Sequence, residues 1–490
     1  MSLLPAFSST EAEKHTRYSL GYNPRLDGLR AVAVLSVLFS HYRIPGFAGG
    51  GYGVDIFFVL SGFLITQVLI KDLEKERTLL PFYWRRFLRL APALVWLCLA
   101  LALFSFFFKN WADFGTARQD ILSSVFYVAN WTRAFSLGSP LYLGNCWSLA
   151  IEEQFYLLWP LFFLIFASQN NIRHLIAGAF SLLFVSISWA FWATFHQYSS
   201  ARIYNGFDTH CSGLLIGCCL ALILKTRRGE AFLKVGGRFW PLAMIVFAVL
   251  VWLKATWNVF LSLLADAAAV LLILTACHAP RSLAGRFLEL RTVVAVGKIS
   301  YSLYLWHYPI FLVMYLHGVP WALNAGIGIP LSFLAAAVSY WFVEQPILRL
   351  RATTWMPVNR LGLAAVSFSI LGILAGGTLF LRETITDAFF LSPTSIIAYG
   401  PHVLKAGESF NVQADGESYL WMKVSRTIPN GTKLRIGSRL LEANGTGRGL
   451  SARLPRDLLS EIKKNEMVII GPDGHPLAPP VPFEITADSQ

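Results

Sequence analysis

Apolar runs separated by short polar segments fill most of the first 380 residues of the chain. About 20 consecutive apolar residues allow a helix to cross the hydrocarbon core of a bilayer. A semi-apolar piece at 121–131 is predicted to be an interfacial or re-entrant helix instead. The longer runs predict eleven membrane spans, at about 27–45, 51–70, 90–108, 147–168, 174–195, 209–224, 240–254, 259–277, 293–316, 322–343 and 361–381.

The pattern changes after residue 382, where short runs of alternating apolar and polar residues begin. Alternation with a period of two is typical of strands with one buried face. Asp-Gly and Asn-Gly pairs favour tight turns between strands. We therefore expect residues 383–490 to form a small all-β sandwich. The alternating runs include 419–424, 433–437 and 466–471, and the turn pairs are Asp415-Gly416, Asn430-Gly431, Asn444-Gly445 and Asp473-Gly474.

These patterns predict an all-α polytopic membrane protein, with a ten-helix core and an eleventh helix, followed by a small all-β domain. The expected parts are a cytoplasmic segment at 1–25, a membrane domain at 26–350, a linker with the eleventh helix at 351–382, and an extracytoplasmic β-sandwich module at 383–490. The composition agrees, because 55% of residues are hydrophobic, 14% are charged and the mean hydropathy is +0.53. Such values exclude an ordinary soluble protein.

The net charge of +13 is best explained by the orientation of the chain in its membrane. With the N-terminus placed in the cytoplasm, the inner segments hold several times more Lys and Arg than the outer segments, as the positive-inside rule requires. We therefore expect a multi-pass protein of the bacterial cytoplasmic membrane, in contact with lipid and without a nucleic-acid partner. The six cysteines show no metal-binding spacing, and no metal is expected.

The first predicted span carries two ionisable residues, Arg30 and His41, eleven positions apart. At about 100° and 1.5 Å per residue, their side chains share one helix face and lie roughly 16 Å apart along the axis. Ionisable groups within a span are costly and indicate a function. The structural alternative is that Arg30 reaches the lipid headgroups while His41 lies at the opposite interface.

Four further patches place charged residues within or beside predicted spans. Each also has an ordinary structural explanation, such as a helix cap, the positive-inside bias, an arginine partner for a buried carboxylate, or a satisfied hydrogen bond. The residues are Asp55 in 50–66, the arginine cluster Arg85, Arg86 and Arg89 in 82–92, the pair Glu152 and Glu153 in 145–160, and His307 in 297–311.

In this order and spacing, the motifs resemble those of the acyltransferase family 3 membrane proteins, which are O-acetyltransferases of cell-surface polysaccharides. Six motifs in one order are highly specific, although each alone is weak. The resemblance implies a ten-helix acyltransferase core, an acyl donor from the cytoplasm that is usually acetyl-CoA, and a sugar hydroxyl as acceptor. The motifs, within about residues 20–350, are RLDGLRAVAVLSVLFSHY, GVDIFFVLSGFLIT, FYWRRFLRLAP, CWSLAIEEQFYLLWP, ISYSLYLWHYP and a final EQP.

The resemblance also implies roles for individual residues. Family function attaches to the Arg30 and His41 pair, to the arginine cluster, and to the motif that holds Trp147, Ser148 and the two glutamates. We expect catalysis to involve His41, Asp55, Glu152, Glu153 and His307, acyl-CoA to bind at Arg30, Arg85, Arg86 and Arg89, and the substrate to contact Trp147, Ser148 and Tyr304.

The sequence departs from the family pattern in two places. Residues 207–210 resemble a segment that commonly ends in Arg, whereas this chain has His210. Some relatives carry an SGNH esterase-like domain after an eleventh helix, but 383–490 contains no Gly-Asp-Ser or Asp-x-x-His block and is too short. We interpret this segment as a non-catalytic module that holds glycan or positions the acceptor, or else as a structural spacer.

A mechanism can be built on the expected depth of these residues. The arginines would hold the phosphates of acetyl-CoA, or another acyl-CoA, at the cytoplasmic mouth, and the pantetheine arm would present its thioester near His41. His41 would act as general base on the hydroxyl of a glycan or lipid-linked sugar, or would take the acyl group itself. Asp55, Glu152 or Glu153 would orient its ring. The alternatives are a transporter or flippase for a lipid-linked glycan, and a non-enzymatic scaffold that displays the β module.

Overall fold

The computed structural model forms two compact units, 1–377 and 378–490. The predicted eleventh span at 361–381 and residues 1–20 lie outside the described residues. Those residues are 21–74, 79–137, 140–167, 172–226, 228–253, 257–278, 281–353, 396–400, 403–405, 418–424, 428, 431–446, 449–459, 463–471, 474 and 476–486.

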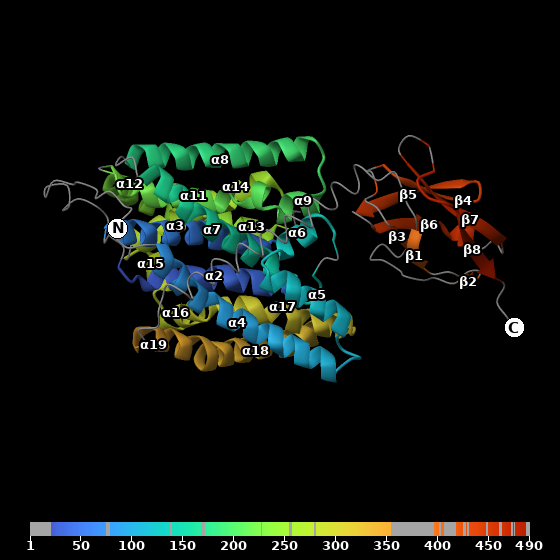
Figure 1. Cartoon of the computed structure of the whole chain (residues 1–490), viewed down its shortest axis with the longest axis horizontal. Helices are drawn as coiled ribbons and strands as arrows, with labels where there is room; N and C mark the ends of the chain where they lie inside the picture. The colour runs from blue at the N-terminus through green and yellow to red at the C-terminus, as the bar shows by residue number, and fades with distance from the viewer. Residues whose placement is uncertain are drawn as a thin grey trace. The chain divides into compact units, whose positions relative to one another are not determined.

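The helical unit has a helix at each of the ten other predicted spans, and its long helices run side by side (Figure 1). By length and hydropathy, the described residues include seven helices able to cross a bilayer, and α11 is a shorter apolar helix. This confirms the prediction of a polytopic helical membrane domain. The helices are α2 (Pro24–His41), α3 (Gly53–Glu74), α4 (Leu79–Phe107), α7 (Cys146–Ala167), α8 (Ile172–Phe195), α11 (Ser212–Ile223), α13 (Trp240–Trp252), α14 (Val259–His278), α17 (Ser300–Leu316) and α18 (Trp321–Val338).

Short helices connect the long ones. The predicted interfacial piece at 121–131 is divided between α5 and α6, and neither is long enough to span a bilayer. A proline at position 346 favours the end of a helix there, but α18 continues through the π-helical turn η3 into α19, whose second residue is Pro346. The π-helical turn just before Pro346 is the local irregularity in this otherwise continuous helix. The connecting elements are α5 (Phe114–Val125), α6 (Ala129–Ala134), α9 (Ser200–Asn205), α10 (Phe207–His210), α12 (Gly229–Gly236), α15 (Leu283–Leu288), α16 (Arg291–Lys298), η3 (Ser339–Glu344) and α19 (Gln345–Thr353).

Helix α2 lies in the interior of the bundle, whereas several other helices present apolar side chains outward. On α2, Leu29, Val34 and Leu38 are fully buried. By contrast, Phe184 on α8 and Leu334 on α18 are more than 60% exposed. Exposed apolar side chains on long helices fit contact with lipid tails, so the polar residues of α2 face protein.

Glycine allows α3 and α11 to pack with their backbones nearly in contact. A Cβ added at Gly62 would lie 1.9 Å from the carbonyl oxygen of Leu214, and one added at Gly217 would lie 2.0 Å from that of Val59. The absence of side chains at both positions is what permits this approach. The close packing holds α3, which carries Asp55 and Ser61, against α11.

The C-terminal unit is an eight-stranded sheet in the order β1-β3-β6-β5-β4-β7-β8-β2, and this confirms the predicted all-β module. Strand β5 pairs with β4 through residues 439–442 and with β6 through residues 443–446, so it joins two layers. Alternate residues from both layers, including Met422, Ile469 and Phe483, form one core. The strands are β1 (Ile396–Gly400), β2 (Val403–Lys405), β3 (Ser418–Val424), β4 (Lys433–Ile436), β5 (Arg439–Thr446), β6 (Gly449–Leu454), β7 (Lys463–Ile470) and β8 (Val481–Thr486).

One predicted turn is wrong. Asn444 and Gly445 lie within β5, where they pair with Ser451 and Leu450 of β6. The preference of Asn-Gly for a turn is a local effect, and here the ladder with β6 overrides it.

Candidate active site

A cavity of about 160 Å³ lies among α2, α3, α4, α7 and α17. It is smaller than the roughly 300–1,000 Å³ of most small-molecule sites, so it suits the slender part of a larger ligand. Its walls are mostly apolar, and its charged groups are three guanidiniums and one carboxylate. The polar residues that matter below are Arg30, Arg86, Arg89, Ser148, Glu152 and Tyr304.

The first turn of α2 sets the position of Arg30. Asn23 caps the helix by accepting a hydrogen bond from the backbone N–H of Arg25, and Pro24 occupies the first turn. Arg30 is ion-paired with Asp27 at 2.8 Å, and the hydroxyl of Tyr22 donates to the other oxygen of Asp27 at 3.0 Å. The guanidinium is thereby held at the cavity wall.

The arginine cluster on α4 is divided between two environments. Arg86 and Arg89 line the cavity, whereas Arg85 does not and is ion-paired with Asp72 of α3. The guanidinium carbon of Arg86 lies 3.1 Å from the ring centroid of Tyr156. Two of the three arginines expected to bind the donor therefore share a cavity with Arg30.

The two glutamates of α7 also have different surroundings. Glu152 lines the cavity and accepts a hydrogen bond from Ser61 at 2.9 Å. Oε1 of Glu153 lies 3.7 Å from Nε of Arg86, whose guanidinium also lies over the ring of Tyr156. Glu153 therefore has the arginine partner that would explain its burial structurally. Glu152 is the carboxylate that faces the cavity.

Ser148 and Tyr304 form the polar pair of the cavity nearest the two histidines described below. Their hydroxyl oxygens are 2.6 Å apart, and the Tyr304 hydroxyl also donates to the Asn145 carbonyl at 3.0 Å. The side-chain amide of Asn145 donates in turn to the Tyr304 carbonyl at 2.5 Å. Trp147 does not line this cavity and instead packs against Tyr204, with ring centroids 4.4 Å apart.

His41, at the end of α2, is hydrogen-bonded to His307 of α17, with 3.1 Å between Nδ1 of His41 and Nε2 of His307. His307 is fully buried, while His41 is half-buried. The ring of Tyr304 lies 5.6 Å from that of His307, so the pair is one aromatic ring away from the cavity. The structure therefore brings together Arg30, Arg86, Arg89, Tyr304 and the two histidines along one path.

The expected carboxylate partner of His41 is not present. Asp55 accepts a hydrogen bond from Ser262, and its Oδ1 lies 3.3 Å from Nε2 of His210. Within the described ranges, no carboxylate contacts His41, and its ring partner is His307. A similar depth in the bundle did not bring Asp55 to His41 because α3 turns this residue toward α10 and α14. His210, at the position where the family pattern commonly has Arg, thus holds the Asp55 carboxylate.

Arg133 of α6 is a candidate that sequence reasoning missed. Its Nε donates to the Asn205 side chain at 3.0 Å, and it forms no ion pair with a described carboxylate. Arg133 and Tyr308 both pack against Gly144. A Cβ added at Gly144 would lie 3.0 Å from Nη1 of Arg133 and 3.0 Å from the hydroxyl of Tyr308. The ring of Tyr308 is 5.0 Å from that of His41. The available signal was an isolated arginine in a predicted outer segment.

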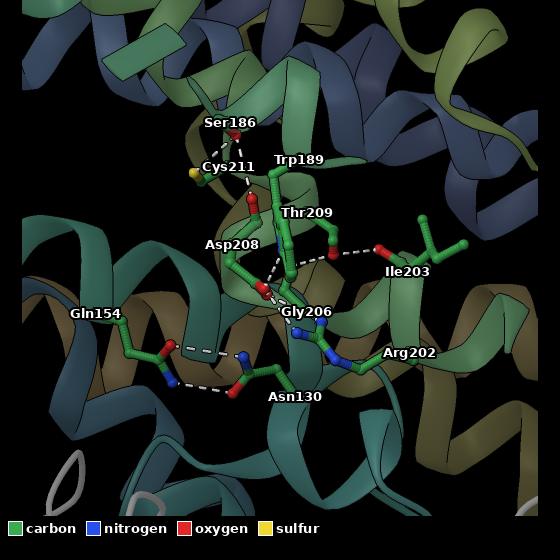
Figure 2. Close-up of polar contacts among 10 residues, drawn as sticks. All are labelled: Asn130, Gln154, Ser186, Trp189, Arg202, Ile203, Gly206, Asp208, Thr209 and Cys211. Carbon is green, nitrogen blue, oxygen red and sulfur yellow. Dashed lines mark hydrogen bonds and ion pairs between the residues drawn. The ribbon is translucent and has the colours of Figure 1, made fainter. Parts of the chain in front are cut away.

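Polar contacts fix the short helices that carry Arg133 and its partner (Figure 2). Asn130 of α6 and Gln154 of α7 exchange side-chain hydrogen bonds of 3.5 and 2.9 Å. Arg202 of α9 forms a two-pronged ion pair with Asp208 of α10, at 2.9 and 2.6 Å. Two-pronged pairs define geometry well, so α9 is fixed against α10, while the amide pair fixes α6 against α7.

Comparisons with known proteins identify the family of the chain. Residues 23–344 match the family model described as an acyltransferase domain. The chain is 36% identical over 361 residues to the peptidoglycan O-acetyltransferase OatA of Listeria monocytogenes, which covers 68% of this chain and 57% of that protein. It is 34% identical over 364 residues to the O-acetyltransferase OatA of Staphylococcus aureus, which covers 70% of this chain and 60% of that protein.

The matched region spans less than two thirds of the length of these relatives. No solved structure matches the chain. The family match nevertheless includes α2, α3, α4, α7 and α17, and with them every charged residue of the cavity. The chain therefore belongs to the family of membrane acyltransferases that its motifs resemble.

Proposed function

We propose that this protein is a membrane O-acyltransferase that moves an acyl group, most simply acetyl, from cytoplasmic acyl-CoA to a hydroxyl of a cell-surface polysaccharide. The observation that carries the proposal is the cavity lined by Arg30, Arg86 and Arg89, with the histidine pair one aromatic ring beyond it, behind Tyr304. Cationic groups at a narrow cavity and an imidazole near its end are what a long anionic thioester needs.

The donor would bind with its phosphates at the three guanidiniums and its arm in the cavity. Guanidinium groups recognise phosphate through paired hydrogen bonds. Arg89 is exposed, which supports access for a nucleotide at that side of the cavity. The small volume supports an occupant no wider than a pantetheine arm, with the nucleotide left outside.

His41 would carry out the proton transfer. As general base it would remove the proton of the acceptor hydroxyl while that oxygen attacks the thioester carbon. The C–S bond would then break, and the departing thiolate would take the proton from His41. In the alternative route, a nitrogen of His41 attacks the thioester carbon, and the C–S bond breaks to release the thiolate of CoA. The acceptor hydroxyl then attacks the acyl carbon, the bond to the imidazole breaks, and the hydroxyl proton passes to the thiolate.

The names of the relatives support a polysaccharide acceptor. The Listeria protein is named for peptidoglycan, and both relatives are named O-acetyltransferases. By analogy, the proposed acceptor of this protein is a polysaccharide of N-acylated amino sugars whose free hydroxyls can be acylated. If the N-terminus is cytoplasmic, as the distribution of Lys and Arg predicts, the arginines would face the cytoplasm and the histidine pair the opposite side, so donor and acceptor would approach from opposite sides of the membrane.

The test uses the full chain, purified into lipid nanodiscs, with radiolabelled acetyl-CoA and a chito-oligosaccharide acceptor. Mass spectrometry of the oligosaccharide should detect an added acetyl group with wild-type protein, and His41→Ala should reduce the rate by about 10²–10⁴-fold. His196→Ala is the matched control, because His196, directly after α8, is exposed and among the described residues contacts only side chains and backbone of α8. Transfer by His41→Ala at the wild-type rate would remove His41 from the reaction.

A further inference from the structure

The hydrogen-bond partners of His41 and His307 allow the protons of both rings to be assigned. Nδ1 of His307 lies 3.0 Å from the carbonyl oxygen of Leu303, one turn earlier on α17. A carbonyl oxygen only accepts hydrogen bonds, so Nδ1 of His307 carries a proton. The remaining nitrogen of His307, Nε2, is the one that faces His41.

His307 is neutral in this setting. Its side chain is fully buried, and no carboxylate in the described part of the chain contacts either ring. A second proton on Nε2 would create a buried cation without an anionic partner, which is costly. Nε2 of His307 is therefore a bare acceptor.

The proton between the two rings then belongs to His41. Two bare nitrogens cannot share a hydrogen bond of 3.1 Å, so Nδ1 of His41 must donate to Nε2 of His307. The backbone of Val37, one turn earlier on α2, is a further hydrogen-bond partner of His41. In neutral His41, the proton on Nδ1 leaves Nε2 with a free lone pair.

We propose that His307 is a positioning residue, which fixes His41 in the tautomer whose Nε2 is the reactive atom. The proposal rests on the function proposed above, and it applies to both routes. As a base, Nε2 would take the acceptor proton; as a nucleophile, it would attack the thioester. His307 itself is buried and its lone pair is occupied, so it does not touch substrate.

The aromatic surroundings support a fixed orientation of the His41 ring. Tyr308 meets it edge-on with 5.0 Å between ring centroids, and Phe311 lies 6.1 Å away. When Nε2 takes a proton, the Nδ1–H of His41 becomes a stronger donor to His307. The pair can therefore stabilise the intermediate imidazolium without the carboxylate that a serine-protease triad uses.

The first test reads the protons directly and needs no activity. The full chain is labelled with 15N-histidine in nanodiscs, and the signals of the two rings are assigned by their loss in His41→Gln and His307→Gln. Both rings should show a protonated Nδ1 and a bare Nε2 at neutral pH. A proton on Nε2 of His41 would overturn the proposal.

The second test compares two amides at position 307. The side-chain oxygen of His307→Gln can occupy the place of Nε2 and accept from His41, whereas His307→Asn reaches only the place of Nδ1 and keeps the contact with Leu303. We expect His307→Gln to keep kcat within about tenfold of wild type, and His307→Asn to lose about 100-fold or more, with KM for acetyl-CoA unchanged in both. In His307→Asn, the 15N signals of His41 should show a mixture of tautomers.

The two tests separate this proposal from the proposed function. Equal kcat losses in the two variants, with His41 still in a single tautomer, would mean that His307 has only a packing role. If the wild-type protein transfers no acetyl group from acetyl-CoA, the proposed function fails, while the 15N spectrum of wild-type protein still decides which nitrogen of His41 is bare.

Discussion

Replacing Arg89 with Gln should weaken the binding of acetyl-CoA, whereas the same replacement at Arg85 should not. The two residues are one turn apart on α4, and the sequence gives no reason to treat them differently. In the structure, Arg89 lines the cavity beside Arg30, while Arg85 is ion-paired with Asp72 and lies outside the cavity. Arg85→Gln is therefore a matched control for loss of positive charge on the same helix.

The expected size of the effect follows from the contact that Arg89 would lose. A hydrogen bond to a charged group contributes about 1.5–3 kcal/mol, and about 1.4 kcal/mol corresponds to a tenfold change in affinity. Arg89→Gln should therefore raise the Kd for acetyl-CoA by about 10- to 150-fold. Arg85→Gln breaks the ion pair with the buried Asp72, so it should lower Tm, but it leaves the donor contacts in place.

Arg86 is less suitable for this comparison. Its guanidinium lies against Tyr156 and near Glu153, so its removal would leave a carboxylate without its cationic neighbour. A loss of binding in Arg86→Gln would then mix donor contacts with damage to the helix interface. Arg89 forms no ion pair with a carboxylate within the described ranges, which makes the change at Arg89 more specific.

The assay is equilibrium binding of radiolabelled acetyl-CoA to the full chain in nanodiscs, with thermal unfolding measured in parallel. Arg89→Lys adds a graded test, because lysine keeps the charge but loses the planar fork, and its Kd should fall between those of wild type and Arg89→Gln. An unchanged Kd in Arg89→Gln, or an equal increase in Arg85→Gln, would refute the assignment of the cavity to the donor.

Three further results are expected. Tyr304→Phe removes the hydroxyl shared with Ser148, and should lower kcat by about tenfold in the acetyl-transfer assay while KM for acetyl-CoA stays within about twofold. Arg133→Gln removes a cation near His41, and should lower single-turnover rates by about 10²-fold if Arg133 stabilises the oxyanion; a normal rate would exclude that role. The pKa of His317 is raised because its ring donates to the carbonyls of Asn110 and Val313. That stabilisation is complete below the unfolded pKa and is lost as pH rises through the folded pKa, so His317→Gln should lower Tm more at about pH 5.5 than at about pH 9.

Hydropathy was enough to locate the helices because the signal for each helix is local. A contiguous apolar run is sufficient to predict burial in lipid or in the bundle. The helices at ten predicted spans follow from runs of apolar residues that are contiguous in sequence. The alternating runs at 419–424 and 433–437 likewise became β3 and β4. In contrast, the Asn444-Gly445 pair was misread as a turn, since the hydrogen bonds that make it part of β5 come from β6.

The site was harder to predict because helix rise gives the depth of a residue but not the neighbour that it faces. Arg30 and His41 were correctly expected on one helix, and the structure adds that His41 pairs with a histidine 266 positions away. Asp55 was expected near His41 from depth alone, yet it faces His210 and Ser262.

The contact between Asp55 and His210 also makes His210 an informative departure from the family pattern. An arginine at position 210 would bring a permanent charge to Asp55, whereas a histidine brings one only when protonated. Because Nδ1 of His210 already donates to the Tyr204 carbonyl at 2.6 Å, its Nε2 can contact Asp55 as a donor only in the imidazolium form, or as an acceptor from a protonated Asp55. Either arrangement places one proton between the two side chains, so His210 can keep a hydrogen bond to Asp55 without the permanent charge of an arginine.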